Sequence, residues 1–224
     1  MKKINKIITA ALLASALLFS FTACNNAADS KDDGDGYAVQ PKHSNSCGAY
    51  AAAYYLTDTN QIKKADIKKT ADEIYKNVQF GESGKAIPFG EDTLDISAYS
   101  DPVKLRDYLN TNNLAASATL KMISDEDAQT YAEGMIIKLK KALNITVPDT
   151  DRIASFEDGM KDCDYCLEIV AVGDTRLHYL FTYIKDNEFY TRDPGDGKEY
   201  KRSEITVEIP KYRFSNSGVF IKAK

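Results

Sequence analysis

The sequence is poor in histidine, has no surplus of positive charge and contains no internal repeat. Only two histidines are present, His43 and His178, and a zinc site built from them and a C-x-x-C pair is not favoured. We expect neither a metal nor another cofactor. The 33 acidic residues outnumber the 29 basic ones, giving a formal net charge of −4, which offers no support for nucleic-acid binding.

The N-terminal residues are typical of an export signal. A basic start precedes an apolar run over residues 7–21, which is too short for a good membrane span. The run ends in Phe21-Thr22-Ala23-Cys24, which resembles the lipobox of bacterial lipoproteins. We expect residues 1–23 to be a signal peptide and Cys24 to carry a lipid that anchors the exported protein to the cell membrane. The alternative is an ordinary signal peptide, with Cys24 incidental.

The following segment, residues 24–36, has the composition of a tether. From residue 25 onward it is small, polar and acidic, with no apolar side chain larger than alanine. Such a segment buries too little surface to offset the entropy lost on ordering. Residues 37–224 are then one domain, long enough to form a core.

Apolar periodicity predicts that the first half of this domain is helical. The alanine-rich run at residues 47–56 suits a buried helix. The longest expected helix has Ser124 as its N-cap, with Asp127 three residues on. The expected helices cover residues 47–56, 67–78, 102–109, 124–143 and 155–160, with a glycine-containing loop at 81–90.

The second half changes to strands. Runs of β-branched and aromatic residues are separated by the turn dipeptides Gly173-Asp174 and Asp186-Asn187. The expected strands cover residues 167–172, 177–184, 188–193 and 219–221. Short connections make them antiparallel neighbours, and helices followed by antiparallel strands indicate an α+β domain.

Four side chains occur in the order that thiol catalysis requires. Gln40 precedes Cys47 by seven residues, and His178 and Asp193 follow downstream. In such catalysis a thiolate attacks, an imidazole moves the proton, a carboxylate orients the imidazole and a donor stabilises the oxyanion. At the start of a helix, the sulfur of Cys47 would face unpaired N–H groups and the positive end of the dipole, which favours the thiolate.

The pairing of His178 with Asp193 follows from an expected hairpin. If Asp186-Asn187 is its tip, Leu180 lies opposite Asp193, and His178 is on the same face as Leu180. His178 and Asp193 are then diagonal neighbours within reach of each other. A loop longer or shorter by one residue would place them on opposite faces.

Each of these residues also has a purely structural interpretation. Cys47 would be a small core residue, His178 a solvated strand-end histidine and Asp193-Pro194-Gly195 a plain turn. None of these interpretations explains why the residues occur in catalytic order. The rival histidine, His43, has no carboxylate near it in the sequence, and we assign it to the surface or to a substrate cleft.

Cys163 and Cys166 form a C-x-x-C pair directly before an expected strand. A thioredoxin-type motif lies instead where a strand turns into a helix. The two alternatives for this pair are a disulfide, as exported proteins form, and two plain thiols.

These residues resemble the papain-like cysteine peptidases, specifically the branch of bacteriocin-leader (double-glycine) peptidases. The matching positions are Gln40, Cys47-Gly48, His178-Tyr179 and Asp193-Pro194. The resemblance implies a papain-like fold and a Cys–His–Asp triad with Gln40 in the oxyanion hole. The sequence contains no transporter segment or ATPase motif, so the leader-processing role of transporter-fused members does not carry over.

Three hypotheses follow for the function. The first is a lipid-anchored, extracytoplasmic thiol hydrolase, a cysteine peptidase whose substrate is a peptide or protein. The second uses the same triad for acyl transfer or amidase chemistry. The third is a non-catalytic surface lipoprotein that retains the fold as a binding module, and it predicts an ordinary reactivity for Cys47.

Overall fold

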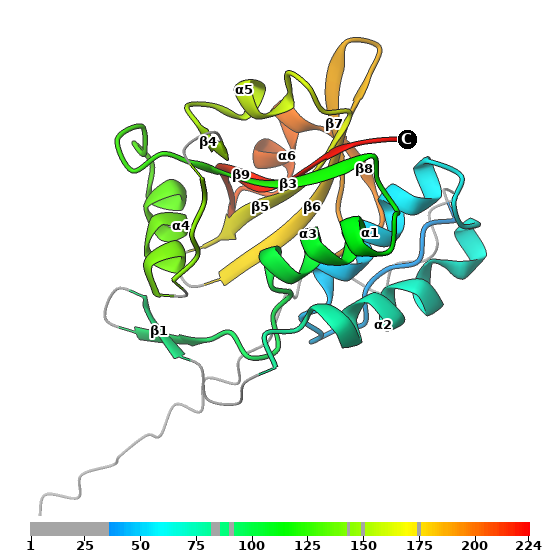
Figure 1. Ribbon diagram of the computed structural model, residues 1–224, viewed down its shortest axis with the longest axis horizontal. Coiled ribbons are helices and arrows are strands. Elements are labelled where there is room, and N and C mark those ends of the chain that lie inside the picture. The colour runs from blue at the N-terminus through cyan, green and yellow to red at the C-terminus, as the bar shows by residue number, and fades with distance from the viewer. Residues whose placement is uncertain (1–35, 82–85, 90–91, 143, 149–150, 174–175) are drawn as a thin grey trace, which may run out of the picture.

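The computed structural model describes residues 36–81, 86–89, 92–142, 144–148, 151–173 and 176–224 (Figure 1). The expected signal peptide, Cys24 and all but the last residue of the expected tether lie outside the described residues.

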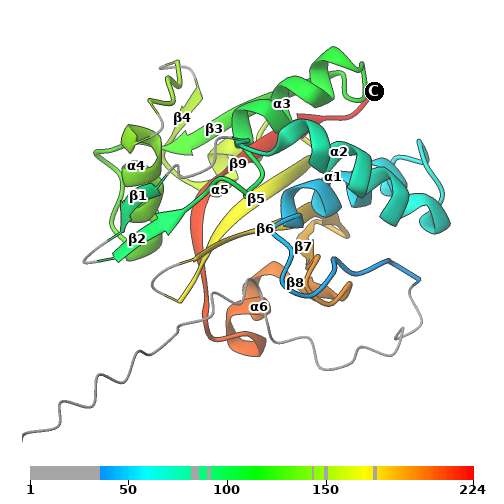
Figure 2. The same cartoon turned by 90° about the horizontal axis from the view of Figure 1, so that it is seen from below.

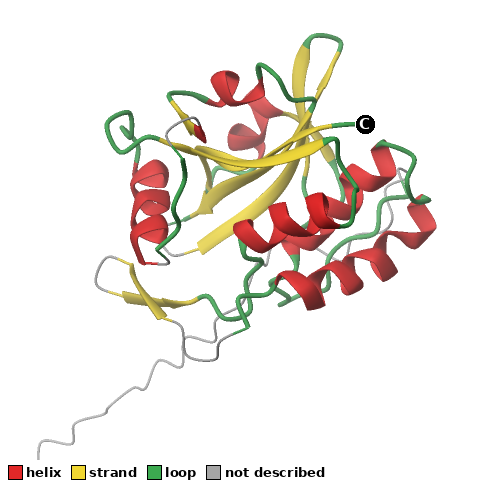
Figure 3. Ribbon diagram, viewed as in Figure 1, coloured by secondary structure: helices red, strands yellow, loops and turns green. Residues whose placement is uncertain are grey.

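Helices dominate the first part of the described chain and strands the second, which confirms the α+β class. Figure 3 shows these helices and strands in the view of Figure 1. The helices are α1 (Cys47–Asp58), the 3-10 helix η1 (Lys64–Asp66), α2 (Ile67–Val78), α3 (Pro102–Thr111), α4 (Tyr131–Ala142), α5 (Phe156–Met160) and α6 (Arg202–Glu208). The strands are β1 (Ala86–Phe89), β2 (Asp92–Asp95), β3 (Ser117–Ile123), β4 (Arg152–Ile153), β5 (Tyr165–Val172), β6 (Arg176–Lys185), β7 (Glu188–Arg192), β8 (Glu199–Lys201) and β9 (Tyr212–Lys222).

The main sheet has seven strands in the order β4-β3-β9-β5-β6-β7-β8. Its neighbours pair antiparallel except for β3 and the two-residue β4, which are parallel. Strands β1 and β2 form a separate hairpin. The expected late strand is β9, which lies between β3 and β5 in the sheet.

The two faces of the sheet bury different cores. Ile169 and Phe181 belong to the large core that includes α1, α2 and α3, whereas Val170 and Leu180 pack with Ile205 of α6. This division follows from the strand geometry, because successive residues of a strand point to opposite faces. Figure 2 shows α6 and the pair of helices α2 and α3 on opposite sides of β6.

The sequence prediction was wrong at residues 81–90 and 124–130, and it assigned no element to residues 117–123. Strand β1 lies within the expected loop, and the unpredicted strand β3 precedes α4 and enters the main sheet. The sheet is therefore not made only of C-terminal strands. The predicted helix at residues 124–143 is shorter than expected, because α4 begins at Tyr131.

The start of α4 is set by a capping box that differs from the predicted one. The hydroxyl of Thr130 accepts a hydrogen bond from the Glu133 N–H at 3.2 Å, and the Glu133 carboxylate accepts one from the Thr130 N–H at 2.8 Å. The predicted cap residues, Ser124 and Asp127, instead hydrogen-bond to each other in a turn before the helix.

Candidate active site

Helix α1 places Cys47 at its first position. Residues Ala49 to Ala53 are fully buried, as expected for a helix that is apolar on all sides. The N-cap residue, Ser46, makes no side-chain bond to the helix, since its hydroxyl lies 2.7 Å from that of Ser44. Cys47 is only 1% exposed and belongs to the large core. The sulfur is therefore at the positive end of α1 and covered from solvent.

The hairpin of β6 and β7 has the predicted register. Lys185 pairs with Glu188, and Phe181 with Arg192. Asp186 and Asn187 have φ angles of 51° and 62°, which the favoured two-residue hairpin turn requires. Asp193 directly follows β7 and so continues the register toward His178.

His178 and Asp193 are in direct contact. Nε2 of His178 lies 2.6 Å from Oδ1 of Asp193, and the two side chains are 0% and 2% exposed. Oδ1 of Asp193 also accepts a hydrogen bond from the Gly195 N–H at 2.7 Å, while Oδ2 accepts one from the Tyr212 hydroxyl at 2.7 Å. The carboxylate is thus held by three partners from three parts of the chain.

The surroundings favour an ionised Asp193. Burial acts to raise the pKa of this carboxyl. The interaction with His178 and the hydrogen bonds from the Gly195 N–H and the Tyr212 hydroxyl act to lower it. Their combined effect is larger, so the pKa lies below its usual value. The ring centroids of His178 and Tyr212 are 5.5 Å apart, so Tyr212 contacts both members of the pair. The sequence contained no signal for Tyr212, because β9 brings it to the site from a distant part of the chain.

Gln40 is fixed beside the loop that follows Asp193. Its backbone N–H donates to the carbonyl of Pro194 at 3.0 Å, and the residue is 5% exposed. Among the described residues, Oε1 of Gln40 has no hydrogen-bond partner. A buried amide oxygen without a partner is unusual, because desolvation without a hydrogen bond is unfavourable.

The start of α1 meets β6 at the residue next to His178. A methyl group on Gly48 would lie 3.1 Å from Cδ2 of Tyr179, so these two residues are in close contact. Tyr179 belongs to the same core as Cys47. Because strand residues alternate, the side chain of His178 leaves β6 on the opposite face, where it is close to Tyr212. The chain segments of Cys47 and His178 are therefore adjacent, with His178 directed away from the α1 face.

A cavity of about 550 Å³ opens on the α6 face beside Asp193. Tyr212 and Asp196 also line it, and the Tyr200 hydroxyl donates to Asp196 at 2.5 Å. Burial and the nearby Asp193 raise the pKa of Asp196. Asp193 thus lines this cavity, whereas His178 does not.

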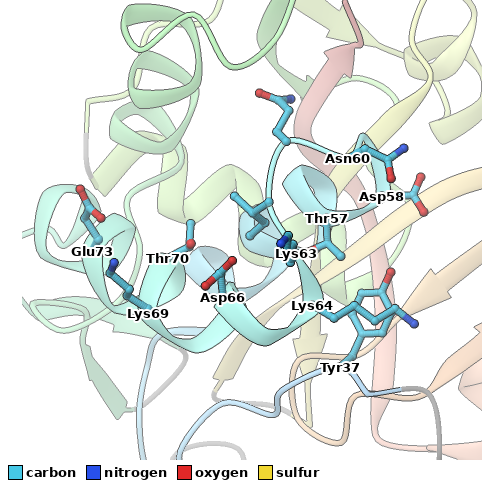
Figure 4. A pocket seen from close by; sticks show the side chains of 12 residues that line it. Tyr37, Thr57, Asp58, Asn60, Lys63, Lys64, Asp66, Lys69, Thr70 and Glu73 are labelled. Atoms are coloured by element: carbon cyan, nitrogen blue, oxygen red, sulfur yellow. The ribbon is translucent and has the colours of Figure 1, made fainter.

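A second hollow lies away from these residues. It has a volume of about 870 Å³ and lies between the end of α1 and the start of α2, with Tyr37, Asp58 and Lys64 among its lining residues (Figure 4). Neither Cys47 nor His178 lines it.

The remaining candidates lie elsewhere. His43 is exposed and has a φ of 63° in the turn before α1. Cys163 and Cys166 are free thiols in the structure, and burial raises the pKa of both. The Cys163 sulfur lies 3.8 Å from Nζ of Lys121, whereas Cys166 is fully buried in the core formed with α5.

Within the described ranges, no cluster of three or more histidine, cysteine or acidic side chains could hold a metal ion. No helix in the same ranges has the length and apolarity needed to cross a membrane. No family model, no curated protein and no solved structure matches this chain.

Proposed function

We propose that the protein is a thiol hydrolase, a cysteine peptidase, in which Cys47 attacks a carbonyl carbon. The observation that carries this proposal is the contact of 2.6 Å between His178 and Asp193 in the interior. Burying an ionisable pair is unfavourable unless its partners compensate, and such pairs with displaced pKa values concentrate at functional sites.

In the proposed reaction, the imidazole of His178 takes the thiol proton and later donates it to the leaving group. Asp193 bonds to Nε2, so the proton transfer uses Nδ1. Gln40, held at Pro194, stabilises the oxyanion through its side-chain amide. Hydrolysis of the resulting thioester by water then regenerates Cys47.

The burial of Cys47 limits the access of a substrate to its thiol. Because Cys47 is 1% exposed and His178 0% exposed, a substrate can reach the thiol only when the segment around the start of α1 moves. We further propose that Cys24 anchors the protein to the outer side of a membrane, with its substrate a peptide or protein in that compartment.

A second candidate function is a non-catalytic binding module on the same lipoprotein. Two observations favour it: Cys47 is buried in the α1 core, and the alternation of β6 directs His178 to the other face. In this case Cys47 is a small core residue and the buried pair is structural.

The pH dependence of Cys47 alkylation by iodoacetamide separates the two candidates. The full-length protein would be compared with His178→Ala, and the peptide containing Cys47 would be quantified by mass spectrometry. We expect alkylation that persists below neutral pH and is lost in His178→Ala, whereas His43→Ala leaves it unchanged. Slow alkylation that rises only at or above the free-thiol value of about 8.5, with the same pH profile in all three proteins, would support the binding module.

A further inference from the structure

Ser100 carries a buried hydroxyl without a hydrogen-bond partner. The residue is 2% exposed, and Oγ forms no hydrogen bond with any of the described residues. Taking a hydroxyl out of water without giving it a hydrogen bond is unfavourable, so such groups require an explanation.

The backbone around Ser100 is held firmly. Ser100 forms an antiparallel bridge with Gln79, and its carbonyl accepts a hydrogen bond from the Tyr179 hydroxyl at 3.2 Å. The next residue, Asp101, caps α3 by accepting a hydrogen bond from the Val103 N–H at 2.8 Å. The unsatisfied hydroxyl therefore does not result from a loose segment.

The hydroxyl lies beside the start of α1. A methyl group on Gly48 would lie 2.7 Å from Cβ and 2.9 Å from Oγ of Ser100. Gly48 directly follows Cys47, and the N-cap Ser46 offers no side-chain bond to the N–H groups there. Two kinds of donor thus converge next to the cysteine: the first N–H groups of α1 and the unpartnered hydroxyl of Ser100.

We propose that the hydroxyl of Ser100 donates a hydrogen bond to the oxyanion that forms when Cys47 attacks its substrate, an inference that rests on the proposed hydrolase function. The sulfur forms a bond to the carbonyl carbon, and the π electron pair moves onto oxygen. Ser100 stabilises this charge together with the N–H groups at the start of α1. The pair then returns to reform the carbonyl, and the leaving group departs with the proton from His178.

Two reagents distinguish this role from a structural one. Acylation of Cys47 by p-nitrophenyl acetate passes through an oxyanion, whereas alkylation by iodoacetamide does not. Both rates would be measured on the Cys47 peptide of the full-length protein and of Ser100→Ala. We expect acylation to fall about 100- to 1,000-fold, which is the loss seen when one oxyanion donor is removed, and alkylation to stay unchanged. The melting temperature should be unchanged or higher, because Oγ makes no hydrogen bond in the folded protein.

Ser217→Ala is the matched control, because Ser217 is equally buried but satisfied. Its hydroxyl accepts from the Ile123 N–H at 3.1 Å and donates to the Ser215 carbonyl at 3.0 Å. This variant should melt at a lower temperature with an unchanged ratio of acylation to alkylation.

If Ser100→Ala is acylated at the wild-type rate, the assignment of Ser100 is overturned and the proposed function stays intact. The same holds if the rates of acylation and alkylation fall equally in this variant. If p-nitrophenyl acetate does not acylate Cys47 in the wild-type protein, the proposed function and the role of Ser100 fail together. They also fail together if His178→Ala reacts with both reagents at the wild-type rates.

Discussion

Nε2 of His178 lies 2.6 Å from Oδ1 of Asp193, although the two residues are 15 positions apart and come from the two arms of one hairpin. The tight turn fixes which residues face each other, and the Tyr212 hydroxyl fixes the other carboxylate oxygen at 2.7 Å. The orientation of the imidazole is thus determined by the sheet, independently of any substrate.

The low pKa of Asp193 predicts a specific acid response of stability. Because the pKa is lower in the folded than in the unfolded protein, ionised Asp193 stabilises the fold above the unfolded pKa of about 4, and this contribution is lost as the pH falls through the folded pKa. Asp193→Asn should therefore flatten the fall of the melting temperature in acid. Melting curves between neutral pH and about pH 2 would measure it, and an acid limb as steep as that of wild type would contradict the prediction.

Gly48→Ala tests the close approach of α1 to Ser100. Alanine normally stabilises a helix relative to glycine by about 0.5–1 kcal/mol, but here the added methyl would lie 2.7 Å from Cβ of Ser100. We expect a net loss of about 1–3 kcal/mol in the free energy of unfolding, as for other overpacked cores, measured by urea denaturation. Adding Ser100→Gly removes the colliding atoms and should restore part of the loss.

Gly134→Ala is the control for this prediction, because a methyl group on Gly134 in α4 would have no atom within 4 Å. It should stabilise the protein by about 0.5–1 kcal/mol. If Gly48→Ala and Gly134→Ala change the free energy of unfolding equally, α1 is not closely packed against Ser100.

Local signals explain what the sequence predicted correctly. The Asp186-Asn187 turn, the short connections and the alternating strands determine the register that joins His178 to Asp193, because each acts over a few residues. The helix expected at residues 102–109 likewise has the start of α3, because proline is favoured at the first helical position.

The errors arose where two local signals competed. Ser124 and Asp127 resemble a helix start, but the complete capping box is at Thr130 and Glu133, six residues on. Strand β3 (Ser117–Ile123) shows alternating burial, and its sequence, SATLKMI, has the same period of two. This alternation is a strand signal, but no strand was predicted there.

Two side chains at the candidate site were beyond sequence reasoning. Tyr212 and Ser100 are ordinary residues in ordinary local sequences, and each reaches the site through long-range packing. The same holds for the burial of Cys47, which follows from how α1 packs between other elements and not from the residues around the cysteine.

The Glu168–Arg202 pair on the α6 face is a stability prediction independent of the candidate site. Glu168 is fully buried, and its carboxylate accepts two bonds from the guanidinium, at 2.7 and 3.0 Å. The Arg202 guanidinium also lies 3.9 Å from the ring centroids of both Phe156 and Phe214. Glu168→Gln keeps the shape but leaves the cation without its counter-charge, so we expect a loss of about 3–5 kcal/mol in the free energy of unfolding.

The exposed pair Lys68–Asp72 in α2 provides the comparison. Its atoms also approach within 2.7 Å, but the two side chains are 65% and 47% exposed. Water and salt screen such a pair, so Asp72→Asn should change the free energy of unfolding by less than about 1 kcal/mol. Urea denaturation of both variants measures the difference, and a loss in Glu168→Gln as small as that in Asp72→Asn would mean that Arg202 is stabilised by its aromatic neighbours and solvent instead of by Glu168.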